Sequence, residues 1–200
     1  MNITDSDKLF KEEVEQKPTS IENNTENNLR LYSEGYKEAG NVLYKFCVEN
    51  QYYESWILFP LVFNYRHYIE LKLKELIFIG KSYLEEKREF PTNEHGLLRL
   101  WREYRNDILP KIDNSIEQSI LDNMEKLIAE FNQKDSKSMK FRYPINKNDF
   151  ENRSLDKPYF DLANFKNVMD KIINFFKEQE FIIQNYQSIK NELISNLYWE

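Results

Sequence analysis

The sequence predicts an all-α fold, a helical bundle of five to six helices, and three observations support this prediction. Hydrophobic residues make up 40% and aromatic residues 15% of the 200 positions, which is ample material for one core. Only four glycines and six prolines are present, too few turn signals for an all-β fold. Apolar residues recur at helical spacing along most of the chain. We therefore expect residues 29–200 to form a single helical domain.

Residues 1–28 differ in composition from the rest of the chain. They carry seven acidic residues against three lysines and lack a sustained apolar period. This segment therefore accounts for about four of the six excess negative charges, and we expect it to be a flexible acidic arm. The remaining body is nearly neutral, which argues against a general nucleic-acid coat protein but leaves room for a local basic site.

The first residues, the length of the apolar segments and the number of cysteines together predict the compartment. The first residues are acidic rather than basic and apolar, unlike a secretory signal. The longest apolar stretch, residues 56–63, is far shorter than the roughly 20 residues that cross a bilayer. Cys47 is the single cysteine, so no intramolecular disulfide can form. We expect a cytoplasmic protein that has no membrane partner.

The helices are expected in the following order. The first covers residues 29–50, and the second runs from residue 54 to about residue 79 and ends at Gly80. The third covers residues 95–108 and is ended by Pro110, and a capping box at Asn114 and Glu117 opens a fourth that reaches Phe131. The helical period then disappears, which predicts a long irregular loop near residues 132–158. Beyond it lies a fifth helix over residues 162–176, which either continues through residue 197 or is followed by a sixth.

Three ionisable residues cluster on the second predicted helix. Arg66 and Glu70 lie one turn apart on its apolar stripe, and Glu70 is also within reach of His67. A buried charge is costly unless it is paired, so one interpretation is an ion pair that fixes helix packing. The other interpretation is a polar functional site, and the sequence leaves both open.

The chain has two histidines, His67 and His95, so any histidine-dependent proton transfer must use one of them. His95 is expected in the first turn of its helix, where the helix dipole favours neutral imidazole and backbone N–H groups can receive an anion. That position suits a general base beside a phosphate, and the alternative is a histidine with a packing or capping role. Two histidines cannot supply a three-histidine zinc site, and we expect neither a metal nor a cofactor.

The only local stretch with nucleic-acid character lies in the long loop. Five basic residues occur between positions 134 and 147 against one acid, Asp135, and aromatic residues are interleaved with them. Lys140 and Arg142 can attract phosphates, and Tyr143 can stack on an unpaired base, so single-stranded RNA is the candidate ligand. A solvated loop pinned by Phe141 and Tyr143 is the alternative.

Three segments within residues 50–145 can be compared with known families. They are Arg66-His67-x-Ile69-Glu70-Leu71-x-Leu73-Lys74, His95-x-Leu97-Leu98-x-Leu100-Trp101 and Asp135-x-x-Ser138-x-x-Phe141-Arg142-Tyr143-Pro144. Taken in this order, they resemble a bacterial group of HEPN-like helical proteins. Active members of the wider superfamily dimerise and cut RNA without metal in toxin–antitoxin, abortive-infection and antiphage defence systems, and many other members are inactive. The resemblance implies a homodimer or higher oligomer, RNA as substrate, and a protein partner encoded nearby.

The resemblance also implies roles for individual residues. Active members carry an Arg and a His with four to six residues between them. Here Arg66-His67 has the right opening but no second His at that distance, whereas Arg88 and His95 have six intervening residues with Glu89 after the Arg. His95 would transfer the proton, one of Arg66, Arg88 and Arg142 would stabilise the phosphorane, and Glu70 and Asp135 would orient the basic side chains.

A non-catalytic interaction or sensor subunit is the competing interpretation. In that case the pairs Arg66/Glu70 and Asp135/Arg142 clamp the loop onto the bundle. Exposure distinguishes the two, because an active site must present His95 and at least one arginine to solvent, whereas a clamp buries them in mutual pairs.

Overall fold

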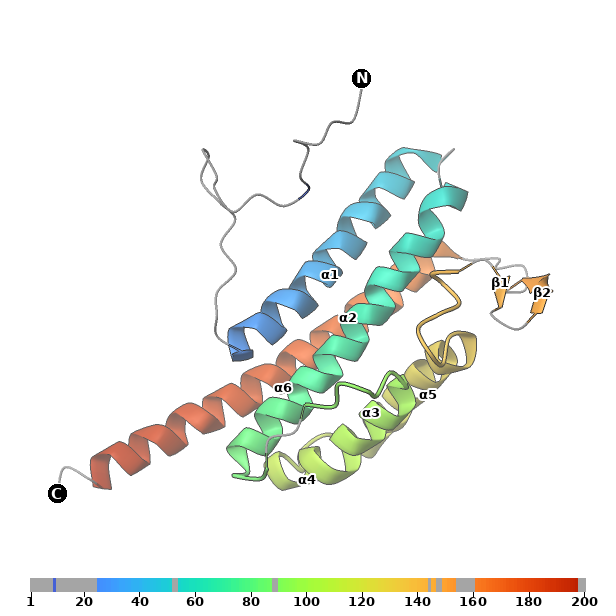
Figure 1. The fold of residues 1–200 in the computed structure, drawn as a ribbon. Helices are drawn as coiled ribbons and strands as arrows, with labels where there is room; N and C mark the ends of the chain where they lie inside the picture. Colours follow the sequence, from blue (N-terminus) through green and yellow to red (C-terminus); the bar gives the residue numbers. More distant parts are fainter. Residues whose placement is uncertain are drawn as a thin grey trace.

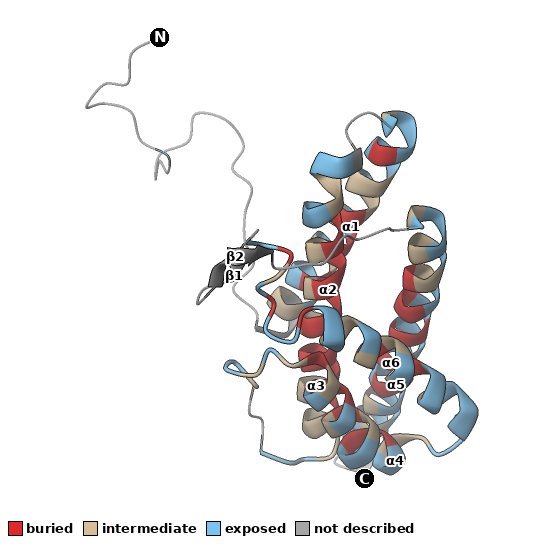
Figure 2. Cartoon of the chain, turned by 90° about the vertical axis from the view of Figure 1, so that its right-hand side faces the viewer, coloured by how far each residue is buried: buried red, intermediate tan, exposed pale blue. Residues whose placement is uncertain are grey.

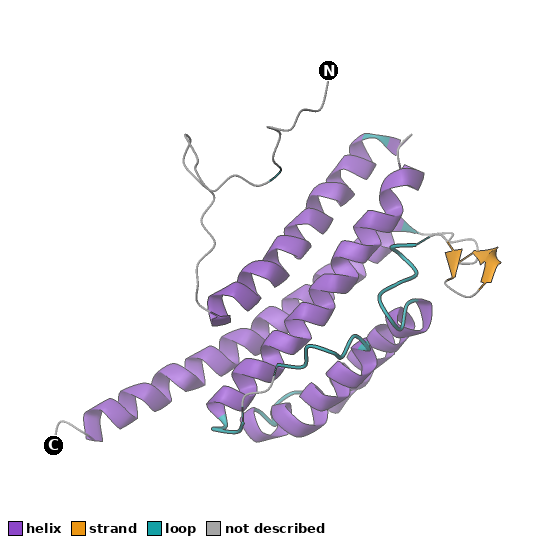
Figure 3. Ribbon diagram, viewed as in Figure 1, coloured by secondary structure: helices purple, strands orange, loops and turns teal. Residues whose placement is uncertain are grey.

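The computed structural model describes residue 9 and residues 25–51, 54–87, 90–143, 145–146, 149–153 and 161–197. Within this part the chain is an all-α helical bundle, as predicted, with one short two-stranded hairpin (Figure 3). The elements are α1 (Thr25–Glu49), α2 (Glu54–Tyr83), α3 (Leu97–Glu103), the π-helix η2 (Tyr104–Ile108), α4 (Leu109–Ile112), α5 (Gln118–Lys134), β1 (Ile145–Asn146), β2 (Asp149–Arg153) and α6 (Leu162–Leu197). None of the helices in it is long and apolar enough to cross a membrane.

Helix α2 is the central element of the bundle. It contacts α1 along its length and also contacts α3, η2 and α6. Figure 1 shows the three long helices α1, α2 and α6 side by side, with α3, α4 and α5 covering the remaining side of α2. Because it is surrounded by other helices, α2 is apolar on more than one face and contributes more buried apolar residues to the core than any other helix.

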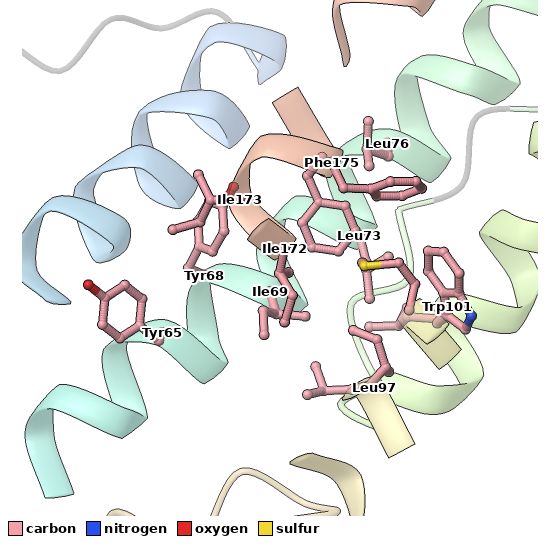
Figure 4. Packing of buried hydrophobic residues seen from close by; sticks show 14 of the residues in the cluster. Tyr65, Tyr68, Ile69, Leu73, Leu76, Leu97, Trp101, Ile172, Ile173 and Phe175 are labelled. Atoms are coloured by element: carbon pink, nitrogen blue, oxygen red, sulfur yellow. The ribbon is translucent and has the colours of Figure 1, made fainter. Parts of the chain in front are cut away.

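The core joins the inner faces of α2, α3 and α6. Ile69 and Leu73 of α2 pack with Trp101 of α3 and with Ile172 of α6 (Figure 4). Figure 2 shows the same arrangement along the helices, with buried residues on the inward faces and exposed residues on the outward ones. Full burial of a large apolar side chain contributes about 1.5–3 kcal/mol each, so this cluster is the main source of stability.

The predicted end of the second helix at Gly80 is wrong, because α2 continues to Tyr83. Gly80 is buried inside the helix, where a Cβ would lie 2.3 Å from Cγ2 of Ile108. The glycine therefore permits the close approach of η2 and does not act as a helix stop. Pro60 lies within the first turns of α2.

The third predicted helix is divided and starts later than expected. Gly96 is the N-cap of α3, without a side-chain cap, so His95 precedes the helix and does not lie in its first turn. Pro110 does not end the helical stretch, because it sits at the start of α4, where a proline costs no helical hydrogen bond. The predicted capping box at Asn114 is also wrong, since α5 begins at Gln118 and its N-cap, Glu117, makes no side-chain cap.

The last part of the chain bears on two predictions, the number of helices after residue 162 and the irregular loop before them. α6 is a single helix of 36 residues, so the fifth predicted helix continues, and the residues described up to Leu197 contain no separate sixth helix. The described part of the predicted irregular loop contains β1 and β2, which form an antiparallel pair in which Ile145 lies opposite Arg153. The predicted flexible arm lies almost wholly outside the described residues, and only Leu9 and residues 25–28 of it are described.

Candidate functional site

Arg66 is the centre of a buried polar cluster that joins three separate segments. Its side chain is fully buried. Nη1 donates to Glu70 Oε2 at 2.8 Å, Nη2 to the carbonyl oxygen of His95 at 2.7 Å, and Nε to the carbonyl oxygen of Asp135 at 3.1 Å. One guanidinium thus fixes the segment before α3 and the segment after α5 onto α2. The sequence-predicted residues Arg66, Glu70, His95 and Asp135 are brought together.

Glu70 is the buried carboxylate of this cluster. Its Oε1 accepts from Lys74 Nζ at 3.1 Å and lies 2.8 Å from His95 Nδ1. Burial acts to raise the pKa of Glu70, but the hydrogen bonds from His95 and Arg66 and the charge of Lys74 outweigh it and lower the pKa below its usual value. Glu70 is therefore ionised at neutral pH and can act only as an acceptor.

His95 lies in the loop just before α3, with one side of its ring held and the other open. Its Nδ1 contacts Glu70, and 55% of its side-chain surface is exposed. The position comes from Arg66, which holds the His95 carbonyl oxygen at 2.7 Å. The exposure of His95 is what an active site requires, whereas the full burial of Arg66 is what a structural clamp requires.

Asp135 caps the end of α5 and organises the turn that follows. Its carboxylate is buried, and Oδ1 accepts from the backbone N–H groups of Met139 at 2.7 Å and Lys140 at 3.1 Å. Its Oδ2 lies 3.6 Å from Arg66 Nε, so the ion pair is with Arg66. For Arg142, the structure gives a different partner from the predicted Asp135: its Nε donates to the carbonyl oxygen of Ser138.

Arg142, Lys140 and Tyr143 lie on the outside of this turn. The guanidinium of Arg142 is 5.6 Å from the ring centre of Phe63 and 5.8 Å from that of Tyr143. The side chains of Arg142 and Tyr143 are exposed and that of Lys140 is half-buried. These three residues are thus placed where they can meet a ligand, unlike Arg66.

His67 points away from the cluster and packs against aromatic rings. Its ring is 4.3 Å from that of Tyr36 in an edge-on arrangement and stacks on Phe63 at 5.6 Å. Burial lowers the pKa of His67, and the positive charges of Arg66, Lys74 and Arg142 act in the same direction while Glu70 opposes them. His67 is therefore a neutral, half-buried packing residue.

Two predicted features remain to be placed. Arg88 lies outside the described residues. In the part of the chain that the structure describes, no group of three or more His, Cys, Asp and Glu residues could hold a metal ion.

A second buried charge cluster was missed by sequence reasoning. The ammonium group of Lys72 lies between Glu75 Oε2 at 3.1 Å and Glu180 Oε2 at 2.6 Å, and Glu75 also accepts from Ser33 Oγ at 2.9 Å. Burial raises the pKa of Glu75, an effect that Lys72 opposes. The cluster joins α1, α2 and α6. The i, i+3 spacing of Lys72 and Glu75 was the available signal, but the partners on α1 and α6 are far away in sequence.

Comparisons with known proteins add no identification. Neither a family model, nor a curated protein, nor a solved structure matches this chain.

Proposed function

We propose that this chain is a HEPN-like, metal-independent endoribonuclease of a bacterial defence or toxin–antitoxin system, with His95 as its proton-transfer residue. One observation carries the proposal. The Nδ1 atom of His95 lies 2.8 Å from a buried carboxylate oxygen of Glu70, while 55% of the His95 side chain is exposed. A histidine oriented by a buried carboxylate and open on its other side has the arrangement of a general base.

The proposed chemistry follows from the ionisation of Glu70. Because the carboxylate can only accept, His95 donates its Nδ1–H to Glu70 and keeps Nε2 free to take a proton. Nε2 would take the proton of an RNA 2′-hydroxyl, whose oxygen then attacks the adjacent phosphorus. The bond from phosphorus to the 5′-oxygen breaks, and that oxygen takes a proton from water. The products are a 2′,3′-cyclic phosphate and a 5′-hydroxyl end.

Arg66 and Lys74 would act on this reaction indirectly, by positioning other groups. Arg66 is fully buried, so it cannot touch a phosphate, and its proposed role is to position the carboxylate and the His95 backbone. Lys74 holds the same carboxylate at 3.1 Å. His67 takes no part in the proposed reaction, because its ring packs between α1 and α2.

The test is cleavage of single-stranded and structured RNAs in excess EDTA, with the new ends mapped. We expect His95→Ala to lose about 10²- to 10⁴-fold in rate, the usual contribution of a general base. Lys171→Ala, an exposed basic residue on α6, serves as the matched purification control and should cleave as wild type does. Equal cleavage by the His95→Ala protein would identify a contaminating nuclease and remove the proposal.

A non-catalytic interaction or sensor subunit of a defence complex is the second candidate. Full burial of Arg66, with three hydrogen bonds to groups of the protein itself, favours this alternative. It predicts no cleavage of any RNA at any protein concentration, together with a stable complex with the product of a neighbouring gene. Light scattering after size exclusion measures both this complex and the proposed homodimer or higher oligomer.

A further inference from the structure

The segment from Lys134 to Tyr143, which we call the basic turn, presents only positive charge to solvent. Lys134, Lys137 and Arg142 are exposed, and Lys140 is half-buried. The single acid of the segment, Asp135, is 1% exposed and faces Arg66 on the inside. A chain with a formal charge of −6 therefore carries a cationic surface at this place.

The basic turn is held in one conformation by its own hydrogen bonds. Asp135 Oδ1 accepts the N–H groups of Met139 and Lys140, and the Arg142 N–H donates to the Met139 carbonyl oxygen at 3.1 Å. Ser138 adopts a φ of 59°, a left-handed conformation that is unfavourable for a residue with a side chain. Such strain persists where the surroundings impose it and is concentrated at binding sites. A preorganised turn loses little entropy when a ligand binds.

The side chain of Arg142 is fixed as well. Nε donates to the Ser138 carbonyl oxygen, Nη2 contacts Met139 Sδ at 3.2 Å, and the guanidinium lies near the rings of Phe63 and Tyr143. Tyr143 as a residue is 51% exposed. A fixed cation beside an open aromatic ring matches the two parts of a nucleotide, since a cation attracts the phosphate and a ring stacks on a base.

We infer that the basic turn binds an unpaired nucleotide of a single strand, with its base stacked on Tyr143 and its phosphate held by Arg142. This inference rests on the proposed function, because it assigns the subsite that would hold RNA beside His95. Arg66 supplies the connection, since it donates to the carbonyl oxygens of both His95 and Asp135. A paired strand hides the faces of its bases, so the site should select single strands over duplexes.

The test is fluorescence anisotropy with a labelled single-stranded RNA, in EDTA, using the His95→Ala protein so that the RNA stays intact. Tyr143→Ala should weaken binding about 5- to 150-fold, the range measured for loss of one stacked base. Tyr143→Phe keeps the ring and should bind as well as its parent. Tyr32→Ala removes a similarly exposed tyrosine from α1, so it is the matched control and should not change binding.

The same assay separates the contribution of Arg142. Arg142→Gln should weaken binding and reduce its dependence on salt, because one phosphate contact is lost. Equal binding by the Tyr143→Ala protein, by an RNA made abasic at every position, or by a duplex would overturn the inference. A free mononucleotide that displaced the labelled RNA at the same concentration as a short unlabelled strand does would also overturn the inference, since the ligand would then be the nucleotide alone.

Binding and cleavage fail in different ways. If the protein binds single strands through Tyr143 but never cleaves them, the basic turn stands and the proposed nuclease does not. If the protein cleaves RNA through His95 with the same affinity after Tyr143→Ala, the nuclease stands and this subsite does not.

Discussion

Removal of the Arg66 side chain should destabilise the protein strongly. Arg66→Ala leaves Glu70 ionised and buried with two of its three partners, and it leaves the carbonyl oxygens of His95 and Asp135 without their donor. Breaking a buried pair by removing one partner costs about 3–5 kcal/mol. We therefore expect a loss of about 4 kcal/mol, which for a chain of this length lowers Tm by about 8–16 °C.

Chemical denaturation followed by circular dichroism and by the fluorescence of the buried Trp101 measures this loss. Arg102→Ala is the matched control, because Arg102 is also paired with a glutamate: it donates two hydrogen bonds to Glu125 at the surface, with 56% of its side chain exposed. An exposed pair contributes less than about 1 kcal/mol. If Arg66→Ala and Arg102→Ala lost the same small amount, the argument that Arg66 holds two segments onto α2 would be wrong.

Three further predictions concern other parts of the bundle. Gly80→Ala should cost about 1–3 kcal/mol, because its Cβ would clash with Ile108 Cγ2, and the smaller Ile108→Val in the same chain should recover part of that loss in denaturation experiments. Lys72→Met should cost about 3–5 kcal/mol, because two buried carboxylates lose their shared cation. A loss of less than about 1 kcal/mol, as small as that of an exposed lysine, would contradict this. An NMR titration of His67 should have its midpoint below pH 6.5, because burial lowers the pKa of this histidine in the folded protein. The stability that depends on the neutral ring is therefore complete above pH 6.5 and is lost as the pH falls through the folded pKa. His67→Phe should make the free energy of unfolding less dependent on pH over that interval.

Much of the fold could be predicted from the sequence, because helical periodicity is a local signal. The all-α class, the positions of the long helices and the loop after residue 131 all follow from it. Helix ends were predicted less well. Gly80 resembles a helix stop in sequence, but the contact with Ile108, which explains this glycine, joins residues 28 positions apart. The π-helix that carries Ile108 has no sequence signal of its own.

The candidate site was predicted in part. The polar spacing of Arg66 and Glu70 and the rarity of histidine identified the residues that meet in the cluster. The different environments of the two histidines could not be predicted, since they depend on contacts between segments that are far apart in the sequence. His67 lies against Tyr36 of α1, and His95 reaches Glu70 from a different loop. The roles of Lys72 and Glu180 depend equally on a contact across 108 residues.

During synthesis, the burial of Lys72 depends on helix α6, which is made last among the described elements. Lys72 and Glu75 leave the ribosome long before Glu180, because α6 follows every other described element in the chain. Until α6 packs against α2, the Lys72 ammonium has water and Glu75 as its neighbours, and the apolar faces of Leu73 and Trp101 lack the cover of Ile172 and Phe175. Nascent chains that stall within α6 should therefore expose this surface and need chaperones.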